Sequence, residues 1–261
     1  MISIVIPAYN EEKRIGRMLE SYGSFFEEKR KNREINDFEI LIAINGTTDR
    51  TEDVVKLFSK KYSRIRYIDC GKLDAKGLAI IEGFKDALKN KDNRLIGFVD
   101  GDLSTPPEAF YDLIKKINGY DGIIADRWDK RSVVTPKQSY FRRFISRGYN
   151  LIVRALFLFP YADTQCGAKL FKREVLEKNI TKFGKSKWGF DIVLLYCLKK
   201  ESNAKITSIP TIWHDEIGSH INIKRTPIRM FASAMRLRLS HSPFNFVVRL
   251  YRKLPEKMKM H

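Results

Sequence analysis

The sequence predicts an α/β protein built on a mostly parallel β-sheet that is flanked by helices. Short apolar runs recur along the first 126 residues, and longer segments with helical spacing separate them. Continuous apolar runs are typical of strands buried on both faces of a parallel sheet, and the helices between them are typical of right-handed crossovers. Polar segments follow three of these runs directly. Because ligands bind beyond the carboxyl ends of such strands, these segments are the first candidates for a site.

The expected elements follow in order along the chain. Strands are predicted at residues 2–6, 38–44, 65–68, 95–99 and 122–125, and helices at about 11–29, 51–62, 77–90 and 107–117. Farther along, we expect a helix at 141–159, a strand at 167–171 and a helix near 190–201. Two basic helices are predicted to begin at Thr226-Pro227 and Ser242-Pro243, where a capping residue precedes a proline.

The predicted helix at 141–159 is amphipathic. At 100° per residue, one face carries Phe141, Phe144, Ile145, Ile152, Ala155, Leu156 and Phe159. The opposite face carries Arg143, Arg147 and Arg154, which we expect to be solvated. Arg142 and Ser146 lie one turn apart, so both can reach a single ligand.

Charge is distributed very unevenly between the two halves of the chain. Residues 1–126 hold 21 Lys and Arg against 22 Asp and Glu, whereas residues 127–261 hold 28 against 9. Such segregation predicts that the second half holds an anionic partner, for which nucleic acid, anionic lipid and phosphorylated substrates all qualify. A solvated basic surface without a partner is the alternative.

Cysteine usage and hydropathy indicate a cytoplasmic protein. Cys70, Cys166 and Cys197 are scattered and show no metal-ligand spacing, which is typical of a reducing compartment. The sequence opens directly on strand-like residues, so no signal peptide is expected. The longest uninterrupted apolar run, residues 155–162, contains Pro160 and has eight residues, whereas a span needs about 20. We therefore expect a protein that can lie on a membrane but does not cross it.

The strongest local signal is Asp100-Gly101-Asp102, immediately after an apolar strand. Two carboxylates two residues apart at a strand end can share a hard divalent cation that also binds a diphosphate. Mg²⁺ and Mn²⁺ prefer such oxygen ligands. We therefore expect Asp100 and Asp102 to hold Mg²⁺ or Mn²⁺, whereas the same pattern in isolation would indicate only a solvated loop.

A wider ordered series surrounds this motif. It comprises residues 2–12 (ISIVIPAYNEE), Asn45-Gly46-Thr47-Thr48-Asp49, Lys76-Gly77 with Gly83, and residues 100–107 (DGDLSTPP). This series resembles the family 2 inverting glycosyltransferases with the GT-A fold over roughly the first 130 residues. The resemblance implies a Rossmann-like sheet and a nucleotide-sugar site formed by Pro7, Tyr9, Glu11, Ile42, Asn45, Lys76, Asp100 and Gly101, with Asp102 as a catalytic residue.

The second half resembles one branch of that family, the polyprenyl-phosphate hexose synthases. The matching segments are Asp126-Arg127, residues 142–148 (RRFISRG) and residues 163–171 (DTQCGAKLF), the last being most similar to the dolichyl-phosphate glucose enzymes. By this resemblance the acceptor phosphate is bound by Arg127, Arg142, Ser146, Gln165 and His220. Arginine forks suit phosphate oxygens, and no acceptor group is expected to compete for these donors.

Four positions depart from the family pattern or have two interpretations. Ile44-Asn45 stands where two acidic residues are usual, which weakens the assignment of the base, and Ser104 stands where mannose synthases can place a glutamine ligand. His220 stands where relatives tend to have a lysine. Asp191 falls where saccharide-extending relatives carry a catalytic base, and it could equally be a helix N-terminal charge.

We predict a GT-A catalytic domain at residues 1–212, with a nucleotide-sugar half at 1–126 and an acceptor half at 127–212. Residues 213–261 are expected to form a loop over the site and basic amphipathic helices on the membrane surface. The predicted reaction transfers a hexose, with inversion, from UDP-glucose or alternatively GDP-mannose to a polyprenyl (dolichyl) phosphate on the cytoplasmic face of the membrane. A saccharide acceptor with Asp191 as base is the first alternative. A nucleic-acid-binding protein is the remote one, and we expect no nucleic-acid partner because no known binding motif accompanies the charge.

Overall fold

The computed structural model describes the chain except residues 74, 137–139, 185–188, 216–225, 244 and 247–261, and it does not describe the side chains of residues 140–145 and 226–230. Within the described part, a seven-stranded sheet forms the centre, with the order β3-β2-β1-β4-β7-β5-β8. Its strands are β1 (Ile2–Ala8), β2 (Phe38–Ile44), β3 (Ile65–Asp69), β4 (Leu95–Val99), β5 (Gly122–Asp126), β7 (Ala168–Lys172) and β8 (Ile206–Pro210).

The sheet is mostly parallel, as predicted, with one exception. β1 is parallel to β2 and β4, β2 is parallel to β3, and β5 is parallel to β8. β7 is antiparallel to both of its neighbours, β4 and β5. Gly97 permits this close pairing, because a Cβ atom at that position would lie 2.5 Å from the backbone oxygen of Lys169. The sequence predicted the strand β7 but did not reveal its direction.

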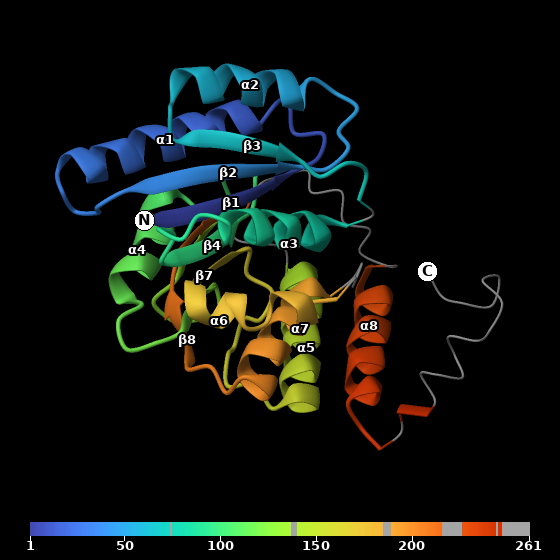
Figure 1. Ribbon diagram of the computed structural model, residues 1–261. Helices are drawn as coiled ribbons and strands as arrows, with labels where there is room; N and C mark the ends of the chain where they lie inside the picture. Colours follow the sequence, from blue (N-terminus) through green and yellow to red (C-terminus); the bar gives the residue numbers. More distant parts are fainter. Residues whose placement is uncertain (74, 137–139, 185–188, 216–225, 244, 247–261) are drawn as a thin grey trace.

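Helices cover both faces of the sheet (Figure 1). α1 (Ile15–Lys31), α2 (Thr51–Lys61) and α4 (Pro107–Lys116) pack with the side chains of one face, such as Ile4 and Ile6. On the other face lie α3 (Lys76–Ala87), α5 (Tyr140–Phe157), α6 (Arg173–Glu177) and α7 (Phe190–Tyr196). A 3₁₀ turn at Ile180–Lys182 precedes α7 and a π-helical turn at Cys197–Glu201 follows it. The result is a three-layer α/β/α arrangement.

The predicted elements of the first half are confirmed, with shifted ends. The first helix begins at Ile15 and not at residue 11, because residues 11–14 form a turn that the Arg14 guanidinium closes on the Glu11 carboxylate. Besides the 3₁₀ turn, four short elements were not predicted: α6, the edge strand β8, and a small second sheet made of β6 (Val133–Thr135) and β9 (Ile212–His214), which are parallel. The expected domain boundary at residue 212 therefore falls inside a strand that pairs with the acceptor half.

The helix α5 corrects the predicted amphipathic face. Its buried residues include Tyr149, Val153 and Phe157, whereas Ile152 and Ala155, which we expected on the packed face, are exposed. Apolar residues surround much of this helix, so periodicity alone could not identify the side that faces the sheet. Arg154, expected to be solvated, is half-buried.

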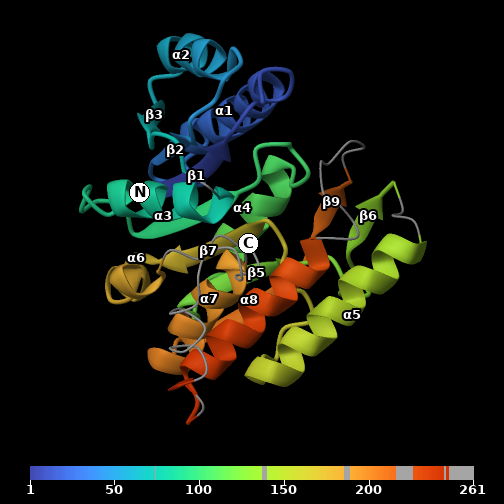
Figure 2. The same cartoon turned by 90° about the vertical axis from the view of Figure 1, so that its right-hand side faces the viewer.

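Figure 2 shows α8 (Thr226–Ser240) running beside α5, and the two helices are in contact. α8 begins at Thr226, as predicted. Most of the second predicted C-terminal helix, from Ser242 onward, lies outside the described residues. Among the helices that are described, none is long and apolar enough to cross a membrane.

Candidate active site

Loops from the carboxyl ends of β1 and β2 are joined by hydrogen bonds around Asn10. Its Oδ1 atom accepts hydrogen bonds from the Thr48 backbone N–H (2.8 Å) and the Thr47 hydroxyl (2.9 Å). Asn10 adopts the left-handed conformation, with φ of 52°, which asparagine tolerates better than most residues. The predicted donor motifs at residues 7–12 and 45–49 are therefore one connected surface in the structure.

Asp49 organises this surface, although the sequence analysis included it in a motif without assigning it a role. Partial burial works against its charge, but hydrogen bonds from Thr47, Thr51 and the Glu12 backbone N–H lower the pKa of Asp49 to about 2. The side chain stays ionised over the physiological range and holds both loops. Its place two residues before α2 was the available signal, because acidic residues favour helix N-termini.

The Asp100-Gly101-Asp102 loop lies against β1 and β7. The Asp100 N–H donates to the Gly167 carbonyl (3.0 Å), and a Cβ atom at Gly101 would lie 3.1 Å from the Pro7 carbonyl oxygen. Asp102 Oδ1 accepts a hydrogen bond from the Ser104 N–H (3.0 Å). Leu103, between them, has φ of 64°, a conformation that bulky residues adopt only when the surroundings impose it. The loop backbone is thus tightly constrained.

Lys76, at the start of α3, forms an ion pair with Asp100 at 2.5 Å. Partial removal from water would lower the pKa of Lys76, but the carboxylates of Asp100, Asp191 and Asp102 outweigh this effect and raise it. Glu11 lies nearby, and partial burial raises its pKa, with Asp102 and Asp49 adding to the rise against the opposing effect of Arg14. These groups form a mixed-charge site at the carboxyl edge of the sheet.

Asp100 and Asp102 fit a divalent cation that is shared with a ligand. Among the described residues, no group of three or more His, Cys, Asp and Glu side chains could enclose a metal ion. Mg²⁺ sites commonly use only one or two carboxylates and take their remaining oxygens from phosphates and water. The donor set is therefore that of a cation bound together with a diphosphate, and the Lys76 ammonium lies against one of the two carboxylates.

Arg127 corrects one expectation about the acceptor residues. Its Nε and Nη2 atoms donate to the two carboxylate oxygens of Asp163, at 2.6 and 3.0 Å, and Asp163 is fully buried. Burial works against the charge of the guanidinium, but Asp163 more than offsets this and raises the pKa of Arg127. An acceptor group therefore does compete for this arginine, contrary to the prediction, because the motif at residues 163–171 folds back beside residue 127.

Two tryptophans enclose the Arg127 guanidinium. Its carbon lies 4.8 Å from the Trp213 ring centroid and 5.7 Å from that of Trp128, and the Arg147 guanidinium carbon lies 5.0 Å from the Trp128 centroid. Cation–π contacts of this kind strengthen when they are desolvated. No sequence pattern predicts this arrangement, since Trp128, Arg147 and Trp213 come from three separate segments.

The other predicted acceptor residues lie along α5 and the loop before β7. Asn150 on α5 joins them: its amide donates to the Ser146 carbonyl (3.0 Å), and its oxygen accepts from the Thr164 N–H (2.9 Å). Gln165 follows directly, and its amide is 3.4 Å from the Thr164 hydroxyl. Arg142 lies in the first turn of α5, but its side chain is outside the described part, as is all of His220. Ser146 and Gln165 are thus brought together, by a residue that we had not singled out.

Asp191, at the start of α7, is paired with a lysine that the sequence interpretation overlooked. The Lys169 ammonium forms an ion pair with Asp191 and donates to the Cys166 carbonyl at 2.6 Å. Lys169 is completely buried. A lysine inside an otherwise apolar strand was the signal, because buried lysines are rare unless they are paired.

Two of the expected nucleotide-site residues differ sharply in exposure. Tyr9 is 56% exposed at the end of β1, where a ligand can reach it. Ile42 is fully buried in the middle of β2, within the cluster that contains Ile4 and Ile6. The expectation that Ile42 contacts the nucleotide does not hold, since its side chain points into the packed face of the sheet. Asn45 is also buried, and its Oδ1 accepts a hydrogen bond from the Leu73 N–H (2.7 Å).

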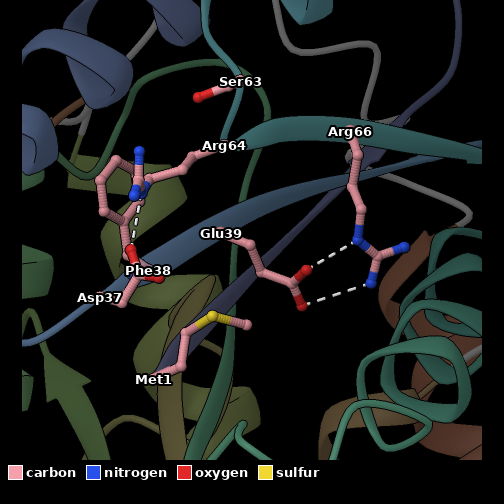
Figure 3. A pocket seen from close by; sticks show the side chains of 7 residues that line it. All are labelled: Met1, Asp37, Phe38, Glu39, Ser63, Arg64 and Arg66. Carbon is pink, nitrogen blue, oxygen red and sulfur yellow. Dashed lines mark hydrogen bonds and ion pairs between the residues drawn. The ribbon is translucent and has the colours of Figure 1, made fainter.

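A hollow of about 260 Å³ lies at the opposite edge of the sheet, at the amino ends of β1, β2 and β3. Figure 3 shows that its charged side chains are bound to one another, Arg64 to Asp37 and Arg66 to Glu39. Mutual pairing leaves these groups little capacity for a ligand. The candidate site is therefore the carboxyl edge, where Asp102, Asn10 and Tyr9 lie.

Comparison with known proteins agrees with this location. The model of the family described as "Glycosyl transferase family 2" matches residues 3–180. Similar sequences include the dolichyl-phosphate beta-glucosyltransferases of Dictyostelium discoideum (29% identity over 92% of this chain and 74% of that one) and Homo sapiens (28%, 84% and 69%). The enzyme of the same name from Saccharomyces cerevisiae is 28% identical over 92% of this chain and 75% of its own.

Solved structures share the fold at low sequence identity. Glucosyl-3-phosphoglycerate synthase from Mycobacterium tuberculosis, in complex with Mn²⁺, UDP and glucosyl-3-phosphoglycerate, superposes with a TM-score of 0.60 at 16% identity, covering 91% of this chain and 79% of that one. Mannosyl-3-phosphoglycerate synthase from Rubrobacter xylanophilus gives 0.64 at 13% identity, covering 100% and 80%. The predicted GT-A fold is confirmed, and the family match over most of the chain shows that this protein belongs to glycosyl transferase family 2.

Proposed function

We propose that this protein transfers glucose from UDP-glucose to a polyprenyl phosphate of the dolichyl type, with inversion at the anomeric carbon. One observation carries the proposal: the acidic donor loop at Asp100 and Asp102 lies beside an acceptor half that is strongly basic and rich in arginine. The sequence relatives named dolichyl-phosphate beta-glucosyltransferases support the choice of acceptor and sugar. GDP-mannose remains the second candidate donor.

In the proposed reaction a phosphate oxygen of the acceptor attacks the anomeric carbon, the bond to the nucleoside diphosphate breaks, and the configuration inverts. Mg²⁺ or Mn²⁺ bound at Asp100 and Asp102 would supply charge neutralisation for the departing diphosphate. Lys76 lies on the same side and supplies a further positive charge. A phosphate monoester is largely ionised near neutral pH, with a second pKa near 6, so the chain has to position the nucleophile more than to deprotonate it.

On the acceptor side, Arg142 and Ser146 on α5 are the proposed phosphate ligands. Arg127, which is bound by Asp163 and enclosed by Trp128 and Trp213, is better suited to shape the site and to contribute charge at short range than to release Asp163. Breaking a buried ion pair of this kind is costly, because the remaining charge has no partner. Gln165 and His220 stay proposed ligands that the described contacts do not test.

The membrane-facing surface is proposed to include α5 and α8. The exposed apolar residues Leu151 (65%) and Ile152 (42%) lie on α5, Leu158 (75%) follows its last residue, and Phe231 (41%) lies on α8. Residues 130–162 contain seven Lys and Arg and no Asp or Glu, and residues 217–255 likewise contain no acid. Exposed apolar groups on basic segments that contain no acid are typical of peripheral binding to anionic lipid. The same helix, α5, carries the proposed ligands of a lipid-borne phosphate.

The cytoplasmic side is proposed for this surface. Cys70, Cys166 and Cys197 are all free thiols in the structure, which fits a reducing compartment. Burial raises the pKa of the Cys166 thiol to about 12, so that cysteine is not a reactive nucleophile.

The proposed function is tested by a donor screen. Purified protein is incubated with dolichyl phosphate in detergent, Mg²⁺ or Mn²⁺, and radiolabelled UDP-glucose or GDP-mannose. We expect label from UDP-glucose to enter a lipid product that mild acid hydrolyses to free glucose. Transfer to oligosaccharide but not to lipid phosphate would favour the saccharide-acceptor alternative and reject the proposal.

Asp102→Asn should lower turnover by at least about 100-fold. Mutating a residue that only hydrogen-bonds to a metal ligand already lowers metal affinity or activity by about 10- to 100-fold, and Asp102 is proposed as a ligand itself. Initial rates at saturating Mn²⁺ measure the effect, and circular dichroism checks that the fold is intact. Asp112→Asn, an exposed carboxylate on α4 paired with Lys115, is the matched control and should retain turnover. Undiminished activity of the wild-type protein in EDTA would contradict the proposed metal role.

Arg142→Ala should raise the KM for polyprenyl phosphate by about 10- to 100-fold with little change in the KM for UDP-glucose, since hydrogen bonds to a charged group are worth about 1.5–3 kcal/mol. Arg143→Ala, one residue along the same helix, is the control. Arg127→Ala should behave differently and reduce the free energy of unfolding by about 3–5 kcal/mol, because it leaves the buried Asp163 carboxylate without its ion-pair partner. Equal effects of Arg142→Ala on both substrates would place this arginine outside the acceptor site.

Leu151→Asp combined with Leu158→Asp should weaken binding to anionic liposomes at least tenfold, because two exposed apolar contacts are replaced by charges of the same sign as the lipid. Flotation with phosphatidylcholine vesicles, with and without phosphatidylserine, measures the effect. Leu57→Asp, on the exposed surface of α2 (67%), is the matched control. If the double variant and the control weaken binding equally, or if neither weakens it, α5 does not face the lipid.

A further inference from the structure

The loop that follows the proposed metal ligands is held in a strained backbone conformation. Leu103 comes directly after Asp102 and has φ of 64°, in the left-handed region, where a Cβ atom lies too close to the following carbonyl oxygen. Such a conformation persists only where the surrounding structure imposes it. The contacts that impose it on Leu103 also fix the position of its neighbour Asp102.

A tyrosine from α1 provides one of these contacts. The Tyr22 hydroxyl donates a hydrogen bond to the Thr105 carbonyl at 2.9 Å, and neither residue is exposed to solvent. The tyrosine ring packs against Phe26 and Phe110, with 5.9 and 6.4 Å between the ring centroids. Because close packing on all sides leaves a buried ring little freedom to move, the hydroxyl holds the loop at a defined place.

The strand β9 provides a matching contact one residue earlier in the loop. The backbone N–H of His214 donates to the Ser104 carbonyl at 2.8 Å. β9 is itself held by its pairing with β6 and by Trp213, which is buried beside Arg127. Two successive carbonyls of the loop, at residues 104 and 105, are therefore bound by groups from the two halves of the chain.

The same segment orients the Asp102 carboxylate. Its Oδ1 atom accepts a hydrogen bond from the Ser104 N–H at 3.0 Å, so the direction of the carboxylate follows the position of residue 104. A metal ligand that is oriented before the cation arrives does not have to be ordered during binding, and this raises the affinity of the site.

We infer that Tyr22 is a positioning residue for the divalent cation: by holding the Thr105 carbonyl, it keeps the strained loop in the conformation that presents Asp102 to the metal. The inference deepens the proposed function and rests on it for the metal site at Asp100 and Asp102. A purely structural hydrogen bond would stabilise the fold to the same degree but would leave the affinity for the cation unchanged, and this difference is the basis of the test.

Direct Mn²⁺ binding separates the two roles without any measurement of activity. Tyr22→Phe removes the hydroxyl and keeps the ring, and the control Tyr111→Phe removes a hydroxyl that is bound to Glu34. Electron paramagnetic resonance measures free Mn²⁺ in titrations with UDP present. We expect Tyr22→Phe to raise the Kd for Mn²⁺ about three- to tenfold, the range that one hydrogen bond accounts for, and Tyr111→Phe to leave it within about twofold. Both variants should lower the Tm by about 2–5 °C.

The outcomes distinguish this inference from the proposals on which it rests. An unchanged Mn²⁺ affinity in Tyr22→Phe would overturn it, and so would an equal loss in Tyr111→Phe, since the effect would then follow stability and not the loop. No Mn²⁺ binding by the wild-type protein with UDP would reject the proposed metal site and this inference with it. Failure of glucose transfer by a protein that binds Mn²⁺ as expected would count against the proposed function alone.

Kinetics then show whether Tyr22 acts through Asp102. At subsaturating Mn²⁺, the rate of Tyr22→Phe should fall by about the factor by which its Kd rises, and excess Mn²⁺ should restore the rate because the bound cation then orders the loop. In the Asp102→Asn background, Tyr22→Phe should change the rate by less than about twofold, since two residues that act as one unit are not additive. A full additional loss in that background, or a rate that excess Mn²⁺ does not restore, would overturn the inference.

Discussion

The antiparallel insertion of β7 between β4 and β5 is the constraint on which the candidate site depends. It places the end of β4, which carries Asp100, against Gly167 at the start of β7, so that the Asp100 N–H donates to the Gly167 carbonyl. A Cβ atom at residue 167 would lie 2.2 Å from an oxygen of the Asp100 carboxylate, so a larger residue there would displace that carboxylate. Through this contact the donor loop and the acceptor segment, residues 163–166, become neighbours. Without it, the two halves of the chain would present their charges at separate places.

The site is held together by pairs of opposite charge that differ in their access to water. Lys76 and Asp100 meet in the open part of the site, where an incoming diphosphate or cation can exchange with either partner at modest cost. The pairs Arg127–Asp163 and Lys169–Asp191 are buried or nearly so. Replacing one partner by a ligand would leave the other charge buried without a counter-charge. This gradient separates residues that can act on a ligand from residues that shape the site. It also explains why the arginines and aspartates of a motif are not all available to bind a ligand, since some of them pair with one another.

The sequence predicted the location of candidate-site residues well where they follow a strand, and poorly where they lie within a strand or on a helix. The Asp100-Gly101-Asp102 loop and the polar segments after β1 and β2 lie together because parallel strands end at one edge, a consequence of topology that periodicity reveals. Ile42 was assigned to the nucleotide although it lies in mid-strand, where side chains enter the core. Arg127 was expected to be free, because sequence spacing cannot show that residue 163 returns beside it. The faces of α5 were misassigned since apolar residues surround the helix and only its packing on the sheet and on α8 selects the inner one.

Four properties follow from the sequence alone: the α/β class, the order of strands and helices in the first half, the acidic loop, and the segregation of basic charge into the second half. These properties are local, since they follow from hydrophobic periodicity, from capping and turn residues, and from composition. Four others are visible only in the folded chain: the direction of β7, the pairing of Lys169 with Asp191, the contacts of Arg127 with Trp128 and Trp213, and the exposed face of α5. Each of these joins residues that are far apart in the chain, and such contacts are selected by the burial of the whole core and the pairing of buried charges, not by any short segment.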